Sequence, residues 1–315
     1  MNIPVEAVFM AQQFRRLNQK FHGVIGAFIH RRRQEQALDI IAAVESDGEF
    51  ADFFGRKRGA FYVGIAAVGA VPAIENAIAN GYDAIIVQPN NGEAQRPYVE
   101  KIVQAGLVAI TTNSRIEGIE GASSVDADPY NQAQVNAELA LTQVPENAKV
   151  VVLKGPSGNF HADQRRIAWQ EVFFDQRPDV QIVGEDFANW NKDEAMALME
   201  DWTTAHGKID AVISMNDNMA AGALEVVKGN PTYKDMLVYG VDGTAEACLL
   251  IQDGSMTSTC LQSAIDLAAL NLDTVHKLLT GEETQIDTDI EEVLITADNV
   301  DEYVEMYKKN GQITE

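Results

Sequence analysis

The stretch KIDAVISMNDNMAAGALEVVKGN, Lys208–Asn230, changes character halfway along its length. Its first half contains an apolar run, Ala211–Met215, which predicts a buried strand. The run then breaks into Asn216, Asp217 and Asn218, before small residues that predict a helix. Two readings of this polar break stay open. Asn216 or Asp217 caps the helix, or contacts a small polar ligand, or one residue caps while the other binds.

The order of short apolar strand, polar loop and helix recurs along the chain from Ile74 onward. Such alternation predicts parallel sheets built from strand–helix–strand units, with helices on both faces. The stretches at 81–91 and 208–218 echo each other, which indicates either two similar halves or chance. We expect strands at 84–87, 107–114, 148–155, 180–187 and 210–215, and helices at 97–106, 129–143 and 192–205.

Composition and charge narrow the choice of partners. The 315 residues carry 47 acidic and 24 basic side chains, a net charge of -23. This charge argues against nucleic acid or an anionic membrane surface as a partner, because both need clustered Lys and Arg. No apolar run reaches the roughly 18 to 20 residues that span a membrane. Cys248 and Cys260 lack metal-ligand spacing, and two buried free thiols are favoured over a disulfide.

Residues 1–73 differ from the rest of the chain. They carry nine basic and seven acidic residues, against 15 and 40 in residues 74–315. One helix is expected around Gln34 to Glu45, and no clear strand–turn–helix order is visible. The first residues also lack the basic and apolar regions of a secretory signal peptide. Two hypotheses stay open for this stretch: a shifted reading frame, or ordinary divergence with a strand at Glu6–Ala11.

Polar side chains follow the predicted strands at their carboxyl ends, where open parallel sheets bind ligands. Amides and carboxylates suit the hydroxyls of a sugar or polyol, and aromatic faces suit its C–H surface. Each residue also has a structural reading: Asp242 as a turn residue, Trp190 as core, His161 as a loop histidine. The residues at these strand ends are Asn90, Asn91, Thr112, Asn113, Ser114, Asn159, Phe160, His161, Trp190, Asn216, Asp217, Asp242 and Gln262.

The same strand ends give little sign of catalysis. They hold no Ser-His-Asp order, no metal-ligand cluster and no phosphate-binding Gly-Lys-Ser/Thr. The stretch GIAAVG, Gly64–Gly69, lacks the third glycine of a dinucleotide fingerprint and a convincing strand before it. We therefore expect a binding protein that is not an enzyme and carries no cofactor or metal.

Five stretches, in this order and spacing, resemble the ribose/galactose-type periplasmic binding proteins, the extracytoplasmic sugar receptors of ABC importers. The resemblance runs from about Ile74 to the C-terminus, some three-quarters of the chain. The same fold also forms the sugar-sensing effector domain of lactose-repressor-type regulators, which stays the alternative, although no helix-turn-helix segment is recognisable. The stretches are GYDAIIVQPNN, KGPSGNFHADQR, DAVISMNDNMAAGALEVV, VYGVDGT and GSMTSTCLQ.

The resemblance implies a fold of two doubly wound α/β lobes joined by three crossovers. The first lobe would comprise residues 1–127 and 263–288, and the second residues 128–262 and 289–315. The lobes would close on a monosaccharide or polyol, which the protein would deliver to an ABC importer's membrane permease in the periplasm or outside the cell.

Ligand residues carry over from the family one position at a time. Asn113 stands at a polar position of the first lobe, and Trp190 at the aromatic stacking position. Asp163 stands where some members carry a ligand-binding Arg, and Arg165 at a position that is more often structural. The full expected set is Asn113, Asn159, His161, Asp163, Trp190, Asn216, Asp242 and Gln262.

Overall fold

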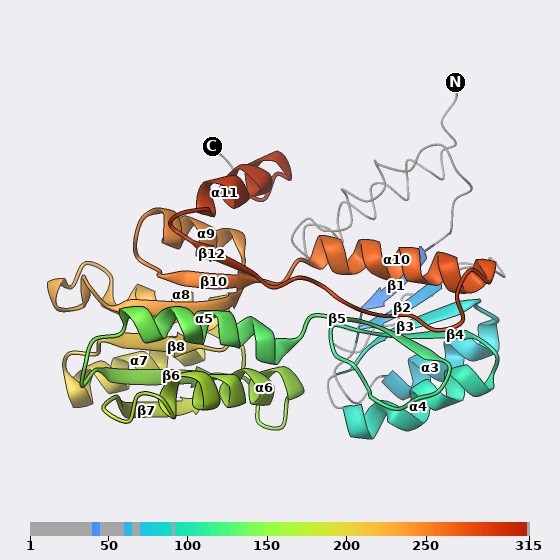
Figure 1. Cartoon of the computed structure of the whole chain (residues 1–315), viewed down its shortest axis with the longest axis horizontal. Coiled ribbons are helices and arrows are strands. Elements are labelled where there is room, and N and C mark those ends of the chain that lie inside the picture. The colour runs from blue at the N-terminus through green and yellow to red at the C-terminus, as the bar shows by residue number, and fades with distance from the viewer. Residues whose placement is uncertain (1–39, 45–59, 65–69, 90–91, 314–315) are drawn as a thin grey trace.

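The computed structural model describes residues 40–44, 60–64, 70–89 and 92–313, which form two separate, mainly parallel sheets with their helices (Figure 1). The first sheet has the order β1-β2-β3-β4-β5-β11, and every neighbouring pair in it is parallel. Its strands are β1 (Ile40–Val44), β2 (Ala60–Gly64), β3 (Ala84–Gln88), β4 (Val108–Thr112), β5 (Ala122–Asp126) and β11 (Asp287–Asp289).

The second sheet has the order β12-β10-β9-β8-β6-β7. All its neighbours are parallel except β12, which runs antiparallel to β10 at one edge. Its strands are β6 (Lys149–Lys154), β7 (Gln181–Phe187), β8 (Ala211–Ser214), β9 (Leu237–Asp242), β10 (Ser258–Leu261) and β12 (Val293–Thr296).

Helices cover both faces of each sheet, as continuous apolar strands require. Figure 1 shows α10 on one face of the first sheet, and α3 and α4 on the other. Short helical segments occupy 169–174 and 231–233. The α-helices of the described residues are α3 (Ala70–Asn80), α4 (Gly92–Gln104), α5 (Pro129–Gln143), α6 (Phe160–Ala168), α7 (Lys192–His206), α8 (Asp217–Val227), α9 (Ala245–Gln252), α10 (Ala264–Thr280) and α11 (Val300–Lys309).

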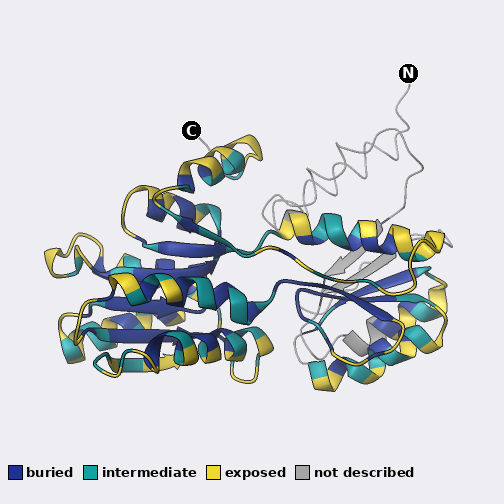
Figure 2. Ribbon diagram, viewed as in Figure 1, coloured by how far each residue is buried: buried dark blue, intermediate teal, exposed yellow. Residues whose placement is uncertain are grey.

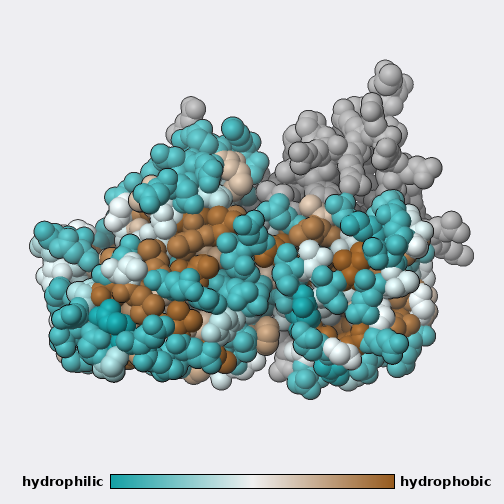
Figure 3. Space-filling model, viewed as in Figure 1, coloured by the Kyte–Doolittle hydropathy of each residue, from teal (hydrophilic) through white to brown (hydrophobic). Residues whose placement is uncertain are grey.

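Each sheet has its own hydrophobic core, and the strands β3, β4, β5, β6, β8, β9 and β10 are mostly buried (Figure 2). The core around the second sheet includes large aromatic side chains among many aliphatic ones. The Trp169 ring lies edge-on to the Phe173 ring and tilted against the Tyr239 ring, with ring centres 5.7 Å and 5.5 Å apart. Hydrophilic side chains cover much of the outer face between apolar patches (Figure 3). None of the described helices is long and apolar enough to cross a membrane. Cys248 and Cys260 are both free and buried, as expected.

The chain passes between the two sheets at three places, after β5, after β10 and after β11 (Figure 1). β11 continues to Asp289, and the Ile290 amide donates to the Asp126 carbonyl oxygen at 2.9 Å. The division of the chain into lobes at residues 127, 262 and 288 stays a prediction.

Two expectations about the first part of the chain are wrong. Residues 40–44, assigned to a helix around Gln34 to Glu45, form strand β1, paired in parallel with β2. Strand β2 also precedes Gly64, where we expected no convincing strand. Both errors have the same cause: in a run of about five apolar residues, periodicity alone cannot separate a buried strand from a helix. The candidate strand at Glu6–Ala11 lies outside the described residues.

Most expectations from residue 74 onward are confirmed to within a few residues. The helix predicted at 129–143 has those bounds, because Asp128 caps it through bonds to the amides of Tyr130 and Asn131. The helix predicted at 97–106 begins earlier, at Gly92, with Pro97 inside it.

Candidate functional site

The residues that follow the strands of the second sheet gather at its carboxyl edge around one buried arginine. Arg165, in α6, is 3% exposed. Its guanidinium Nη1 donates to the Met215 carbonyl oxygen at 2.7 Å, and Nη2 donates to Gln262 Oε1 at 2.7 Å and Gln132 Oε1 at 2.8 Å. Nη2 also lies 3.9 Å from Asp242 Oδ1. Arg165 therefore ties the ends of β8, β9 and β10 together.

Asp242 ends β9 and keeps an open carboxylate. Its backbone has φ 122°, a conformation that non-glycine residues rarely adopt. The side chain is 31% exposed, and its carboxylate accepts no hydrogen bond from another described residue. Burial raises the pKa of Asp242 to about 6, and the nearby Arg165 charge opposes that rise. Asp242 thus offers two acceptor oxygens to a ligand hydroxyl.

Trp190 follows β7 and forms an aromatic wall beside the same edge. Its ring lies over Gly155, the residue after β6, where a Cβ would come within 2.3 Å of the indole. The Arg165 Cζ atom lies 5.8 Å from the centre of the ring. The Trp190 backbone has φ 61°, and its carbonyl oxygen accepts from Asn218 Nδ2 at 2.8 Å. Only a glycine at 155 allows the indole to lie this close to β6.

In the polar break after β8, Asn216 and Asp217 have different roles. Asn216 caps α8, because its Oδ1 accepts from the Met219 amide at 3.0 Å, while its Nδ2 donates to no described residue. Asp217 points inward, where its carboxylate accepts from the Thr259 hydroxyl at 2.6 Å and the Thr244 amide at 2.8 Å. The capping reading therefore holds for Asn216, and its amide nitrogen is still available for a ligand.

Asn113 is the residue of the first sheet that reaches this site in the described part of the chain. It follows β4 with φ 62° and is 9% exposed. Its Oδ1 accepts from Gln262 Nε2 at 2.8 Å, and its carbonyl oxygen accepts a hydrogen bond from His161 Nε2. Burial, and then the Arg165 charge, lower the pKa of His161 to about 4, so the ring is neutral near pH 7. His161 therefore joins the two sheets as a neutral donor.

The structure thus brings most of the expected ligand residues together. We call Asn113, His161, Arg165, Trp190, Asp242 and Gln262 the strand-end cluster, with Asn216 directly after Met215. Two further expected residues lie at the start of α6. Asn159 caps α6 by accepting from the Ala162 amide at 3.1 Å, and Asp163 is exposed in the first turn of that helix.

The sequence did not show that Arg165 is the hub of these contacts. Its position was expected to be more often structural, and in the structure it bonds to Gln262 and lies beside Asp242. Gln132, buried in α5, was not singled out. A signal for it exists in the sequence: Gln132 and Asn136 are four residues apart, in line with the small apolar residues of the buried face of α5.

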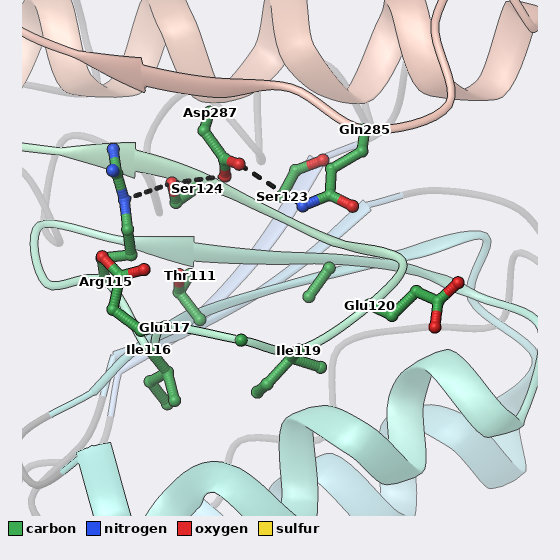
Figure 4. A pocket seen from close by; sticks show the side chains of 12 residues that line it. Thr111, Arg115, Ile116, Glu117, Ile119, Glu120, Ser123, Ser124, Gln285 and Asp287 are labelled. Carbon is green, nitrogen blue, oxygen red and sulfur yellow. Dashed lines mark hydrogen bonds between the residues drawn. The ribbon is translucent and has the colours of Figure 1, made fainter.

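A pocket of about 340 Å³ lies on the first sheet and is lined by residues other than those of the cluster. Figure 4 shows Arg115, Ser124, Asp287 and Gln285 bonded to one another along one side of it. The Ser124 hydroxyl donates to Asp287 Oδ1 at 2.7 Å and accepts from Arg115 Nε at 2.9 Å. These groups satisfy each other, so this pocket offers a ligand fewer open partners than the strand-end cluster.

The chemistry of the strand-end cluster is that of recognition. It combines one carboxylate, amide groups, a neutral imidazole and an aromatic face around a fixed guanidinium. No group of His, Cys, Asp and Glu among the described residues has a geometry that would hold a metal ion. Planar groups that both donate and accept suit a polyhydroxylated ligand.

Comparison with known proteins decides between the families that use this fold. The profile described as "Periplasmic binding protein domain" matches residues 55–283. The chain belongs to this family. The match begins ahead of Ile74, so residues 55–73 are part of the family's domain, contrary to the expected start of the resemblance.

Named relatives of this periplasmic binding protein are receptors for small solutes. The chain is 28% identical over 233 residues to the xylitol-binding protein of Mycolicibacterium smegmatis, covering 74% of this chain and 66% of that protein. It is 27% identical over 212 residues to the ribose import binding protein RbsB of Bacillus subtilis, covering 67% of this chain and 68% of that one.

Solved structures agree on the fold. An ABC transporter periplasmic solute binding protein from Actinobacillus succinogenes with bound D-allose superposes with a TM-score of 0.70 and 27% identity, covering 76% of this chain and 86% of that one. These relatives are binding proteins rather than enzymes, and they support the solute-receptor reading over the regulator. Membership of the family implies an extracytoplasmic location.

Proposed function

We propose that this protein captures a monosaccharide or polyol between its two lobes and delivers it to an ABC importer in the periplasm or at the outer face of a cell membrane. One observation carries the proposal: polar side chains that follow strands of both sheets meet at one site, where Asn113 of the first sheet contacts Gln262 and His161. Hydroxyls of a sugar would replace part of these contacts. Relatives named for xylitol and ribose support this ligand class.

Each side chain has a separate role in this proposal. The Asp242 carboxylate accepts two hydroxyl hydrogen bonds, and Asn216 Nδ2 donates one, since neither group is occupied by a described residue. The Trp190 ring stacks on the C–H face of the sugar. The buried Arg165 holds Asp242 and Gln262 in register.

Binding proceeds by closure of one lobe on the other. The ligand first meets the side chains of the second sheet, and closure then brings Asn113 against it. An affinity in the micromolar range, about -8 kcal/mol, suffices for capture and later release. We place the lobes at residues 1–127 with 263–288, and 128–262 with 289–315.

A thermal melt of the purified chain, with and without a panel of pentoses, hexoses and polyols, tests the proposal. A ligand at about 1,000 times its dissociation constant adds about 4 kcal/mol of stability. One sugar or polyol should raise the melting temperature and the others should not. A cooperative melt that no member of the panel shifts would count against a sugar or polyol as the ligand.

The pocket of the first sheet, shown in Figure 4, supplies the matched control. Asp242 and Asp287 are both carboxylates that line candidate sites, one in each sheet. At the same ligand concentration, Asp242→Asn should reduce the ligand-induced shift, whereas Asp287→Asn should leave it intact. The opposite result would move the ligand to the pocket of Figure 4.

A further inference from the structure

The turn that carries Asp242 is held in an unfavourable backbone conformation. Asp242 has φ 122°, and the next residue, Gly243, has φ 69°. A non-glycine residue in this region persists only where its surroundings impose the conformation. Gly243 has no alternative, since a Cβ there would lie 2.9 Å from the Leu261 Cα atom. The strain therefore needs contacts that hold it, and these can be traced.

Two side chains hold the amides of this turn from inside the lobe. The Thr259 hydroxyl accepts from the Gly243 amide at 3.1 Å and donates to Asp217 Oδ1 at 2.6 Å. The other oxygen of Asp217 accepts from the Thr244 amide at 2.8 Å. Asp217 is 1% exposed, so water does not compete for these bonds. Both amides that follow Asp242 are thereby fixed.

The carbonyl of the turn is held from a different direction. The Tyr307 hydroxyl donates a hydrogen bond to the Gly243 carbonyl oxygen. Tyr307 belongs to α11, the C-terminal helix, which packs against α9 directly after the turn (Figure 1). Helix α11 supplies none of the side chains of the strand-end cluster. Its bond to Gly243 links the end of the chain to the backbone of Asp242.

We propose that Tyr307 is a positioning residue for ligand binding: from the C-terminal helix it locks the strained Asp242–Gly243 turn and so aims the Asp242 carboxylate at the ligand. The inference rests on the proposed function. It assigns α11 a part in binding, although the helix touches no ligand. When the Tyr307 bond is lost, the turn relaxes and Asp242 samples orientations that do not bind.

The test compares Tyr307→Phe with Tyr303→Phe. Both tyrosines lie on α11, one turn apart, are half-buried and pack against the same core. Of the two tyrosines, Tyr307 alone bonds to the turn. Loss of one hydrogen bond should weaken affinity for the sugar found in the melt about three- to tenfold. Tyr303→Phe should leave that affinity unchanged.

A double-mutant cycle separates positioning from general loosening. If Tyr307 acts through Asp242, then Tyr307→Phe should have no further effect on affinity in the Asp242→Asn background. A loss of the same size in both backgrounds would overturn the inference. Equal losses for Tyr307→Phe and Tyr303→Phe would overturn it as well.

Amide hydrogen exchange in the ligand-free protein gives a readout that does not depend on the ligand. The Gly243 and Thr244 amides should exchange faster in Tyr307→Phe than in wild type or Tyr303→Phe. Unchanged exchange would overturn the inference even for a chain that binds sugar. If wild type binds no member of the panel, the proposed function fails separately, and faster exchange would still show that Tyr307 holds the turn.

Discussion

The two sheets contribute unequally to the strand-end cluster. In the second sheet the residues after β7, β9 and β10 all take part, and Arg165 fixes two of them. In the described part of the first sheet only the end of β4 does, through Asn113. The second-sheet groups are anchored by buried bonds to Gln132 and the Met215 carbonyl oxygen, whereas the contacts of Asn113 with the cluster cross between the sheets.

This difference bears on how each sheet would contribute to ligand binding. Groups held by buried networks are preorganised, so they lose little entropy when a ligand arrives. A group whose bonds cross between lobes is in place only while the lobes are together. We infer that the second sheet supplies most of the affinity, and that the first supplies the closing contact.

The largest expected loss of ligand affinity follows substitution of Asp242. Asp242→Asn keeps the shape of the side chain but removes the charge that strengthens hydrogen bonds from ligand hydroxyls. Affinity for the sugar or polyol, measured by calorimetry, should fall tenfold or more while the melt stays cooperative. An unchanged affinity would remove Asp242 from the site and would break the proposed dominance of the second sheet.

The next largest loss of ligand affinity is expected for a substitution at Gly155. A methyl group there would lie 2.3 Å from the Trp190 ring and would push the indole out of place. Gly155→Ala should weaken binding about fivefold to tenfold, because stacking on an aromatic face contributes about 1 kcal/mol or more. Binding is measured by titration of the tryptophan fluorescence.

Gly184→Ala is the matched control for that substitution. A Cβ at Gly184 would lie 2.5 Å from the Trp202 ring, so the same crowding of a tryptophan occurs in the same sheet, away from the cluster. Gly184→Ala should lower the melting temperature and leave the affinity alone. If both variants weaken binding equally, overpacking of the lobe and not Trp190 explains the loss.

A smaller loss of ligand affinity is expected for a substitution at Asn113, which follows β4 of the first sheet. Asn113→Gly removes the side chain and tolerates φ 62°, which alanine would not. Affinity should fall about two- to fivefold, the size of one net hydrogen bond. Small-angle scattering should also show a more open ligand-free form, since the bond to Gln262 is lost. A loss as large as that of Asp242→Asn would show that the two sheets contribute equally.

The same two regions differ in how well the sequence predicts them. From residue 129 onward, the capping residues and apolar runs in the sequence lie where the structure has helix starts and strands. Local sequence signals and tertiary structure therefore agree. Before residue 74 the strands β1 and β2 are runs of only five residues, and a helix was equally compatible with the first.

In the site, position after a strand was enough to place Asp242, Trp190 and Gln262 at one edge of the second sheet, while their part in ligand binding stays a prediction. It could not find Arg165 as the hub. That role depends on Gln132 and Met215, which are distant in sequence and meet it only in the fold. Nor could it separate Asn216 from Asp217, because both readings of the polar break suit a short polar side chain at the start of a helix.

The last expected effect concerns the stability of the protein rather than its affinity, at the end of β9 that carries Asp242. Burial raises the pKa of Asp242 from 3.8 to about 6, so between these pH values the folded chain binds more protons at this site than the unfolded chain. Stability contributed by this group therefore falls as pH rises through that window, and above about pH 6 the full cost of the buried charge is present.

Asp242→Asn carries no such cost. It should be more stable than wild type at pH 7.5, by about 1 kcal/mol because the side chain is partly exposed, and no more stable at pH 4. Urea unfolding at both pH values measures the difference. A variant that is less stable at pH 7.5 would show that the attraction between Asp242 and Arg165 outweighs burial, and that the second sheet keeps this carboxylate for its stability as well as for its ligand.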